Sequence, residues 1–248
     1  MPVPVMSYCG PPPLPAELLG RWNLDPLLIA ILALATLWVC LAPQHHPRQR
    51  SAALAGIGLL VLIFISPLCA LTVALFSARV VHHVLLVAVA APLLALALPV
   101  RATGWTAALP KLLSPLLVLH TLVFWLWHAP DAYALALAST PVYWAMQVSL
   151  LLSATLFWAA TLRATPARAI AALLAMTLQM GLLGALLVFA GQPLYGPHFA
   201  TTAPFGLDPH ADQQLAGLIM WVPASLPYLL VAVWRLAAWL RQAEARQA

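Results

Sequence analysis

Long apolar runs, separated by short polar or proline-containing stretches, repeat along the whole chain. Seven runs stand out, at about residues 27–41, 52–75, 80–98, 112–127, 142–162, 169–190 and 215–236. A helix needs about 20 apolar residues to cross the hydrocarbon core of a bilayer, so the first and fourth runs need their flanks to span it. The runs lack the period-two alternation of barrel strands, and backbone groups in lipid must bond within their own segment. The pattern therefore predicts an all-α polytopic membrane protein with seven transmembrane helices.

Composition supports this prediction. Charged residues make up 7% of the chain and hydrophobic residues 64%, and the mean hydropathy is +0.95. Ordinary globular domains have about 25% charged residues, so this chain has too few to solvate a surface. We expect a stiff, solvated, proline-rich outer tail at 1–24, one seven-helix membrane domain at 25–241 and a cytoplasmic tail at 242–248. The first residues carry no basic segment and no small-residue cleavage site, so we expect no cleaved signal peptide.

The basic residues are distributed unevenly between the two sets of connections. One set has nine: Arg48, Arg50, Arg101, Lys111, Arg163, Arg168, Arg235, Arg241 and Arg246. The other set has two, Arg21 and Arg79. The positive-inside rule then predicts an N-terminus outside the cell and a cytoplasmic C-terminus. The same bias accounts for the sequence pI of about 9.6, and because no basic patch is interleaved with aromatic residues, we expect no nucleic-acid partner.

Histidines and aspartates gather on the predicted outer face. The group comprises His82, His83, His128, Asp131, His198, Asp208, His210 and Asp212, with Cys69 and Arg79 beside it, whereas His45 and His46 fall on the inner face. Each of these residues alone is an ordinary interfacial residue, but their number on one face indicates metal binding, since imidazole suits Cu, Zn and Fe. Adjacent helical residues point about 100° apart, so His82 and His83 cannot both face one point. One of the two can line the bundle interior, while the other faces lipid headgroups or a loop.

The membrane interior carries fewer chemical signals. His120 lies near the middle of the fourth run, where an ionisable group needs a partner, and Gln147 or Gln179 could supply one. Thioethers from Met176, Met180 and Met220 could pass Cu(I) or simply pack in the core. The three cysteines, Cys9, Cys40 and Cys69, share no CxxC spacing, so we expect no disulfide framework. Cys69 is then either a soft metal ligand or a small packing residue.

Two segments carry a resemblance to a known family. Residues 126–130, Leu-Trp-His-Ala-Pro, with Tyr133 following, and residues 212–223, Asp-Gln-Gln-Leu-Ala-Gly-Leu-Ile-Met-Trp-Val-Pro, resemble the signatures of the CtaG family of multi-pass cytochrome c oxidase assembly factors. Further matches are Ser66-Pro67-Leu68, His83-Val84-Leu85-Leu86 with Pro92, Phe157-Trp158 and Pro193-Leu194-Tyr195. The similarity extends from about residue 25 to 241. It implies an assembly factor for a heme-copper oxidase in the bacterial inner (plasma) membrane, aiding copper delivery or insertion at the outer face. Its partners would be oxidase subunits and a copper donor protein.

The resemblance carries over His83, His128 and Asp212, and we expect copper to bind His83 and His128. His82, His210 or Cys69 would complete the ligand set, because three or fewer ligands with an open position permit transfer to a partner. The sequence departs from the family at Arg79 and Gln147, where histidines are typical, at His82, where a glutamine is typical, and at Cys69, where an aspartate is typical. Asp131 and Asp212 would orient the imidazoles as carboxylate acceptors. Asp212 could equally cap free amides at the start of the last helix.

Two other classes of function remain open. A heme-binding redox protein needs paired histidines at matching depth, and a small metal transporter needs broken helices around a midplane site, which Pro67, Pro92, Pro223 and Pro227 would permit. No Ser/His/Asp or Cys/His arrangement has a recognisable spacing, so we do not expect an enzyme.

Overall fold

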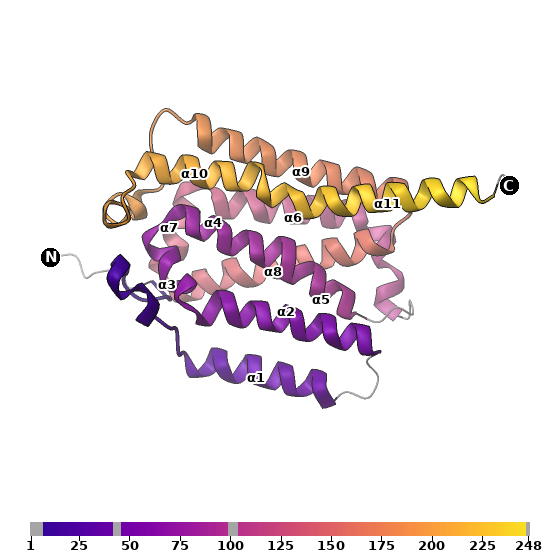
Figure 1. Cartoon of the computed structure of the whole chain (residues 1–248), viewed down its shortest axis with the longest axis horizontal. Coiled ribbons are helices and arrows are strands. Elements are labelled where there is room, and N and C mark those ends of the chain that lie inside the picture. The colour runs from indigo at the N-terminus through magenta and orange to yellow at the C-terminus, as the bar shows by residue number, and fades with distance from the viewer. Residues whose placement is uncertain (1–6, 42–45, 99–103, 247–248) are drawn as a thin grey trace.

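The computed structural model describes residues 7–41, 46–98 and 104–246 (Figure 1). Six segments in these ranges are long and apolar enough to cross a membrane. They are α2 (Pro47–Ile65), α4–η2–α5 (Phe76–Ala97), η4–α6 (Leu109–His128), α8 (Thr140–Arg163), α9 (Pro166–Phe189) and α10–η7–α11 (Pro209–Glu244). A seventh apolar helix, α1 (Pro26–Leu41), has 16 residues and is shorter than a full crossing. Six of the seven predicted helices are thus confirmed as candidate spans, and the crossing by α1 stays a prediction.

Three of the spans are composite. The third predicted run consists of α4 (Phe76–Val84), the π-helix η2 (Leu85–Ala90) and α5 (Ala91–Ala97). The fourth begins with the single turn η4 (Leu109–Leu112) and continues as α6 (Leu113–His128). The last is divided into α10 (Pro209–Trp221), η7 (Pro223–Ser225) and α11 (Leu226–Glu244). Short elements complete the described chain: η1 (Pro15–Gly20), α3 (Pro67–Ala74), η3 (Gly104–Ala107), α7 (Pro130–Ala138), η5 (Gly196–His198) and η6 (Ala203–Phe205).

Prolines and side-chain caps set many of the helix boundaries. Proline fixes its own φ and lacks an N–H, so the first turn of a helix tolerates it well. Helices α2, α3 and α9 each begin at a proline. At α2 the Nδ1 atom of His46 accepts from the backbone N–H of Arg48 at 3.4 Å, and Gln49 Oε1 accepts from the His46 N–H at 3.2 Å. His46 thus has a structural capping role. The other predicted inner histidine, His45, lies outside the described residues.

The π-helix η2 lies in the middle of the α4–η2–α5 span. The Ala91 N–H bonds the carbonyl of Leu86, five residues back, and the next such bond would need an N–H from Pro92, which has none. The carbonyl of Val87 would therefore stay unbonded in lipid. The indole Nε1 of Trp158 on α8 donates to it at 2.9 Å, so a neighbouring helix satisfies the group.

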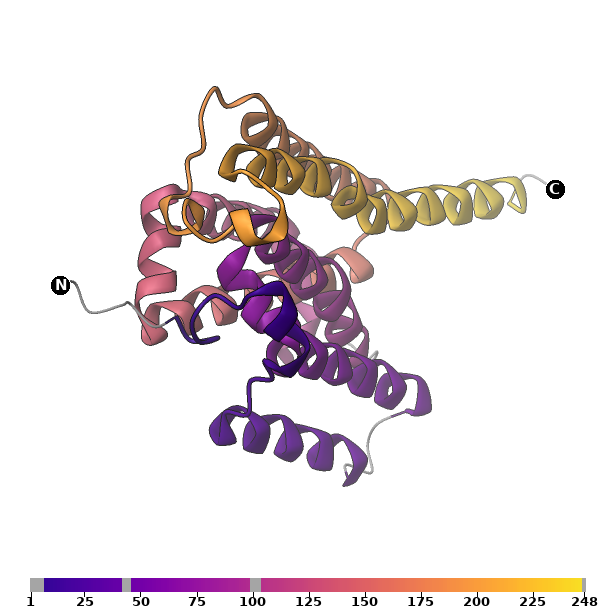
Figure 2. The same ribbon diagram turned by 60° about the vertical axis from the view of Figure 1, so that its left-hand side comes forward.

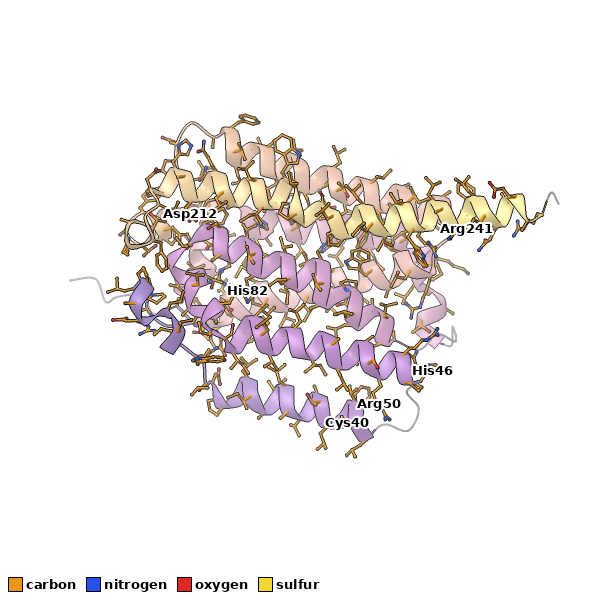
Figure 3. The ribbon with its side chains drawn as sticks, viewed as in Figure 1. Cys40, His46, Arg50, His82, Asp212 and Arg241 are labelled. Carbon is orange, nitrogen blue, oxygen red and sulfur yellow. A yellow bond between two sulfur atoms is a disulfide. The ribbon has the colours of Figure 1, made fainter. Side chains whose placement is uncertain are left out.

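The helices run up and down one bundle, and the two termini lie at opposite ends of it (Figure 1). Helix α1 lies at one edge beside α2, and α9 with α10–α11 forms the opposite edge, while α4 and α8 lie between them (Figures 1 and 2). Residues 7–24, α3, α7 and the 190–208 loop occupy what we call the N-terminal end of the bundle. His46, Arg50 and Arg241 lie at the other end, which agrees with the predicted charge bias (Figure 3). The orientation in the membrane stays a prediction.

Two boundaries differ from the predicted runs. The second run does not form one helix, because Ser66 is extended, with ψ 169°, and caps α3 by accepting from the Leu68 N–H. The nine-residue helix α7 follows α6 directly and was not predicted, since a helix this short has no transmembrane length signal.

Candidate histidine and methionine site

Two histidines from separate helices meet inside the N-terminal half of the bundle. His83 on α4 and His128 at the end of α6 are each 5% exposed, and their ring centroids lie 6.0 Å apart. His128 Nδ1 donates to the carbonyl of Phe124 at 2.7 Å, which leaves Nε2 with a free lone pair. The Nε2 atom of His83 lies 3.5 Å from the amide nitrogen of Gln147, the outer limit of a hydrogen bond. The structure therefore brings the predicted pair together, with His83 Nε2 facing Gln147 and His128 Nε2 keeping its lone pair.

A cavity of about 20 Å³ adjoins the two rings. Its lining residues are Val80, His83, Val84, Val87, Phe124, His128, Leu150, Met180 and Met220. A space of this size holds about one water molecule or one ion. Both methionines are 2% exposed and come from helices α9 and α10, so the histidine pair and the two methionines that line the cavity come from four different helices.

His82 points away from this cavity. It is fully buried, and its ring lies edge-on to Phe64 of α2, with centroids 4.9 Å apart. Neither of its ring nitrogens has a hydrogen-bond partner among the described residues. The angular argument for His82 and His83 is thus confirmed: the two neighbours face different helices, α2 and α6.

Arg79 lies one turn before His83 and is fully buried. Its guanidinium carbon lies 5.4 Å from the centroid of the Tyr143 ring, a cation–π contact. Within the described parts of the chain, none of its three side-chain nitrogens has a hydrogen-bond partner. The cavity therefore lies near an unneutralised positive charge.

Asp212, one of the two carboxylates predicted to orient the histidines, has another role. Asp212 is fully buried and accepts from the backbone N–H groups of Phe76, at 2.6 Å, and Ser77, at 3.2 Å, and from the Ser77 hydroxyl. It therefore caps α4 and not, as the alternative proposed, its own helix. Asp208 caps α10, accepting from His210 N at 2.9 Å and Ala211 N at 3.0 Å. These backbone bonds lower the pKa of the Asp208 carboxyl.

Two further candidate residues lie apart from the pair. Asp131 is exposed in the first turn of α7 and bonds none of the described histidines. His210 uses its Nε2 on the carbonyl of Ala190 at 2.8 Å, which connects the start of α10 to the end of α9. The structure therefore gives His210 a helix-linking contact and leaves Asp131 without a role at this site.

Cys69 forms a disulfide with Cys9, across 60 residues of sequence, so the prediction of no disulfide was wrong. A disulfide sulfur is not a thiolate donor, so the bonded Cys69 cannot serve as a metal ligand. The bond also corrects the picture of a solvated tail: Ser7 and Cys9 are 7% exposed, and Tyr8 stacks on Tyr143 and donates to Asp25. Sequence spacing gave no signal for the pairing because the two cysteines approach only in the folded chain.

The deep histidine also has a different partner from those predicted. His120 Nδ1 lies 2.9 Å from the hydroxyl of Ser153, and its ring stacks on Phe157. Gln147 faces His83, and Gln179 accepts from the indole of Trp125 at 3.0 Å. His120 is therefore a buried residue of the α6–α8 contact, separate from the His83–His128 pair.

Aromatic residues connect the 190–208 loop to the histidine pair, which the sequence reasoning did not anticipate. Tyr195 donates to the carbonyl of His128 at 2.8 Å and stacks on Phe76. Tyr133 donates to Nε2 of His198 at 2.6 Å, and burial lowers the pKa of His198 to about 4, so this ring is neutral and accepts. Both tyrosines belong to the segments that resemble the family, and this resemblance was the sequence signal that could have identified them.

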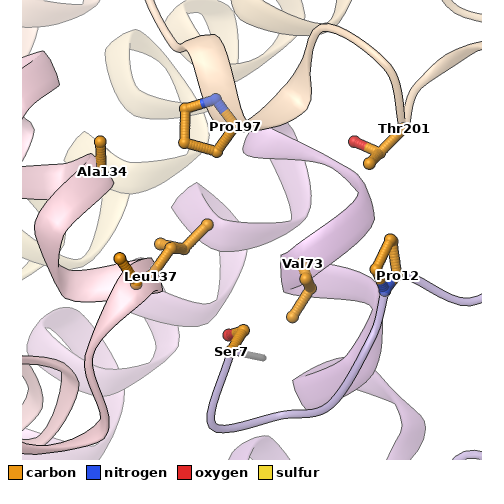
Figure 4. A pocket seen from close by; sticks show the side chains of 8 residues that line it. Ser7, Pro12, Val73, Ala134, Leu137, Pro197 and Thr201 are labelled. Carbon is orange, nitrogen blue, oxygen red and sulfur yellow. The ribbon is translucent and has the colours of Figure 1, made fainter. Parts of the chain in front are cut away.

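A second, larger cavity of about 310 Å³ opens at the N-terminal end, between the tail, α3, α7 and the 190–208 loop (Figure 4). Mostly apolar side chains line it, including Val73, Leu137 and Pro197. It does not include either member of the histidine pair.

Within the described residues, no three side chains of His, Cys, Asp or Glu are grouped so as to hold a metal ion. The family model described as cytochrome c oxidase caa3 assembly factor (Caa3_CtaG) matches residues 32–242. No curated protein and no solved structure matches the chain. The matched stretch begins in α1 and ends in α11, two residues before the end of the last span, and so contains the other five long spans, the histidine pair and both cavity methionines. The chain therefore belongs to the family of cytochrome c oxidase caa3 assembly factors.

Proposed function

We propose that this protein assists the assembly of a heme-copper cytochrome c oxidase by holding copper, as cargo, at the outer side of a bacterial plasma membrane. The observation that carries the proposal is the meeting of His83 and His128, whose ring centroids lie 6.0 Å apart beside a cavity large enough for one ion. Imidazole is a common copper ligand, and a buried pair limits loss of the ion to water. The role is one of binding and transfer to oxidase subunits, with no catalytic step.

The outer location follows from the charge bias. In the sequence, nine of the eleven basic residues fall in the set of connections predicted to lie opposite the histidine pair, and such residues favour the cytoplasmic side. A reporter fused after Ala248 should therefore read cytoplasmic, and one inserted in the 190–208 loop should read outside. A cytoplasmic reading for the loop would refute the proposed location.

The cavity size argues against the heme-binding alternative. Pockets for drug-sized and cofactor-sized ligands measure about 300–1,000 Å³, whereas the space beside the histidine pair is about 20 Å³. His120, the deep histidine, bonds Ser153 and stacks on Phe157. A porphyrin would require the helices around the pair to separate.

The assembly role is tested by deleting the gene under copper limitation. Active oxidase should fall while transcripts of its subunits stay unchanged, and added copper should partly restore activity. The control is the deletion strain carrying a plasmid copy of the wild-type gene. Normal oxidase activity in the copper-limited deletion strain would refute the proposed function.

A further inference from the structure

Residues of α6 and α9 line a groove of about 240 Å³ on the side of the bundle. The lining residues are Leu117, Val118, Thr121, Leu122, Ala175 and Gln179. Val118 is 56% exposed and Leu122 63%, and the segment 109–128 has the smallest buried share of the six long spans. In a membrane this face is therefore covered either by lipid or by another protein.

Two polar side chains of the groove lie near the middle of their helices. Gln179 lies 10 residues before the end of α9 at Phe189 and 13 residues after its start at Pro166. Thr121 lies seven residues before the end of α6 at His128. At 1.5 Å per residue, Gln179 is about 15 Å from the nearer end of its helix, which is half of a hydrocarbon core of about 30 Å. Neither lipid tails nor water can supply a hydrogen-bond partner at that depth.

One hydrogen bond fixes the direction of the Gln179 amide. The indole of Trp125 has an N–H donor and no acceptor, so the atom that it bonds at 3.0 Å is the carbonyl oxygen of Gln179. The NH₂ group of Gln179 keeps two N–H donors, and neither has an acceptor among the described residues. The groove thus contains an amide group that has half of its hydrogen-bonding capacity unused.

The hydroxyl of Thr121 is a further unpaired group. The hydroxyls of Thr36, Thr161 and Thr177 each donate to the carbonyl four residues earlier, at 2.8–2.9 Å, as helical threonines commonly do. Within the parts of the chain that the structure describes, Thr121 makes no such bond. An unpaired donor in hydrocarbon costs free energy, so this groove is suited to a partner that supplies acceptors.

We propose that the groove binds a transmembrane helix of an oxidase subunit, and that this helix presents a hydrogen-bond acceptor to Gln179 and Thr121. A hydroxyl, an amide oxygen or an exposed backbone carbonyl would serve, since such groups bond across helices in membranes. Ala175 contributes only a methyl group to the groove, and small residues let a second helix approach closely. The oxidase subunit as the source of the helix rests on the function proposed above, whereas the need for an acceptor rests on the groove itself.

A second copy of this chain fits the groove less well. A two-fold contact uses the same surface on both subunits, so it would place one concave surface against another and leave both grooves unfilled. A single helix, about 10 Å across, has the convex shape that the groove lacks. We therefore assign the groove to a helix of a different protein.

The test is photo-crosslinking in host membranes, with p-benzoylphenylalanine in place of Leu122, which lines the groove. The control has the same crosslinker at Leu34, which is 65% exposed on α1, at the opposite edge of the bundle from α9. We expect mass spectrometry to identify a heme-copper oxidase subunit in the adduct from Leu122 and not in material from Leu34.

Substitutions in the Leu122 crosslinking chain then test the polar contact. Gln179→Leu should lower the adduct yield about 3- to 20-fold, the range expected for one hydrogen bond between membrane helices. Trp125→Phe is the matched control, because it removes the same internal bond but keeps the amide donors, and it should keep the parental yield. Equal abundance and melting temperature in detergent show that both variants are folded.

An adduct between two copies of this chain, the absence of an oxidase adduct at Leu122, or a parental yield in Gln179→Leu would overturn the proposal. If Leu122 captures an oxidase subunit while a copper-limited deletion strain keeps normal oxidase, the docking site stands and the proposed function fails. If the deletion strain loses oxidase but Leu122 captures no oxidase subunit, the docking site fails and the assembly role stands.

Discussion

The contact between α9 and α10 gives a prediction whose size follows from the structure. In Gly184→Ala the new Cβ would lie 2.8 Å from the carbonyl oxygen of Gly217, whereas ordinary van der Waals contact begins at about 3.4 Å, so the helices must move apart by about 0.6 Å. Forcing an extra carbon into a packed interface costs about 1–3 kcal/mol. Alanine also gains about 1 kcal/mol of helix propensity over glycine, which partly offsets this cost.

Gly181→Ala on the same helix is the matched control. Its Cβ would meet the Trp221 side chain at 3.7 Å, an ordinary contact, so this variant gains the propensity term without the clash. The propensity terms cancel between the two variants, and Gly184→Ala should be less stable than Gly181→Ala by about 1–3 kcal/mol. At about 2–4 °C per kcal/mol for a chain of this size, thermal unfolding in detergent resolves the difference. Equal or greater stability of Gly184→Ala would refute the close backbone contact.

Two further predictions concern polar groups at the N-terminal end. Asp212→Ala should remove about 1–3 kcal/mol of stability, because it leaves the buried N–H groups of Phe76 and Ser77 without an acceptor. Asp208→Ala, which removes an exposed cap, should cost less. Equal melting temperatures of the two variants would contradict the buried cap. Burial lowers the pKa of His198 from 6.5 to about 4. Between pH 6.5 and pH 4 the unfolded chain therefore binds a proton at this residue that the folded chain does not. Stability should therefore be independent of this residue above pH 6.5 and fall by up to about 3 kcal/mol as the pH drops from 6.5 to 4. His198→Gln, which keeps an acceptor for Tyr133, should remove that dependence, and an unchanged pH profile in this variant would count against the buried neutral ring.

Features that depend on local sequence were predictable. Apolar runs of about 20 residues located four of the six spans within a few residues, since lipid forces each segment to satisfy its own backbone bonds, whereas the second run extended into α3 and the last was shorter than α10–α11. The 100° step between neighbours separated His82 from His83 before any contact was known. The family-like segments around His83 and His128 singled out two imidazoles whose ring centroids lie 6.0 Å apart in the structure.

Features that depend on which helices touch were not predictable. The Cys9–Cys69 pairing requires the tail to fold back over α3, and nothing in the spacing of the cysteines encodes that path. Asp212 has the sequence position of a cap for its own helix, yet it caps α4, because the rotation of α10 about its axis decides which amides its carboxylate meets. Met180 and Met220 have the spacing and burial of core residues, so only the cavity beside the histidine pair distinguishes them from Met176.

The stretch from α9 through the 190–208 loop to α10 is joined to the rest of the N-terminal end by several polar bonds. Tyr195 donates to the His128 carbonyl, Thr201 donates to the Ala74 carbonyl, Tyr133 donates to His198, and Asp212 accepts from the start of α4. The Gly184–Gly217 contact holds α9 and α10 together, so Asp212 also fixes this helix pair to α4. A partner that displaces the loop must therefore leave α10 in place or break the buried bonds of Asp212, which costs more than breaking an exposed bond.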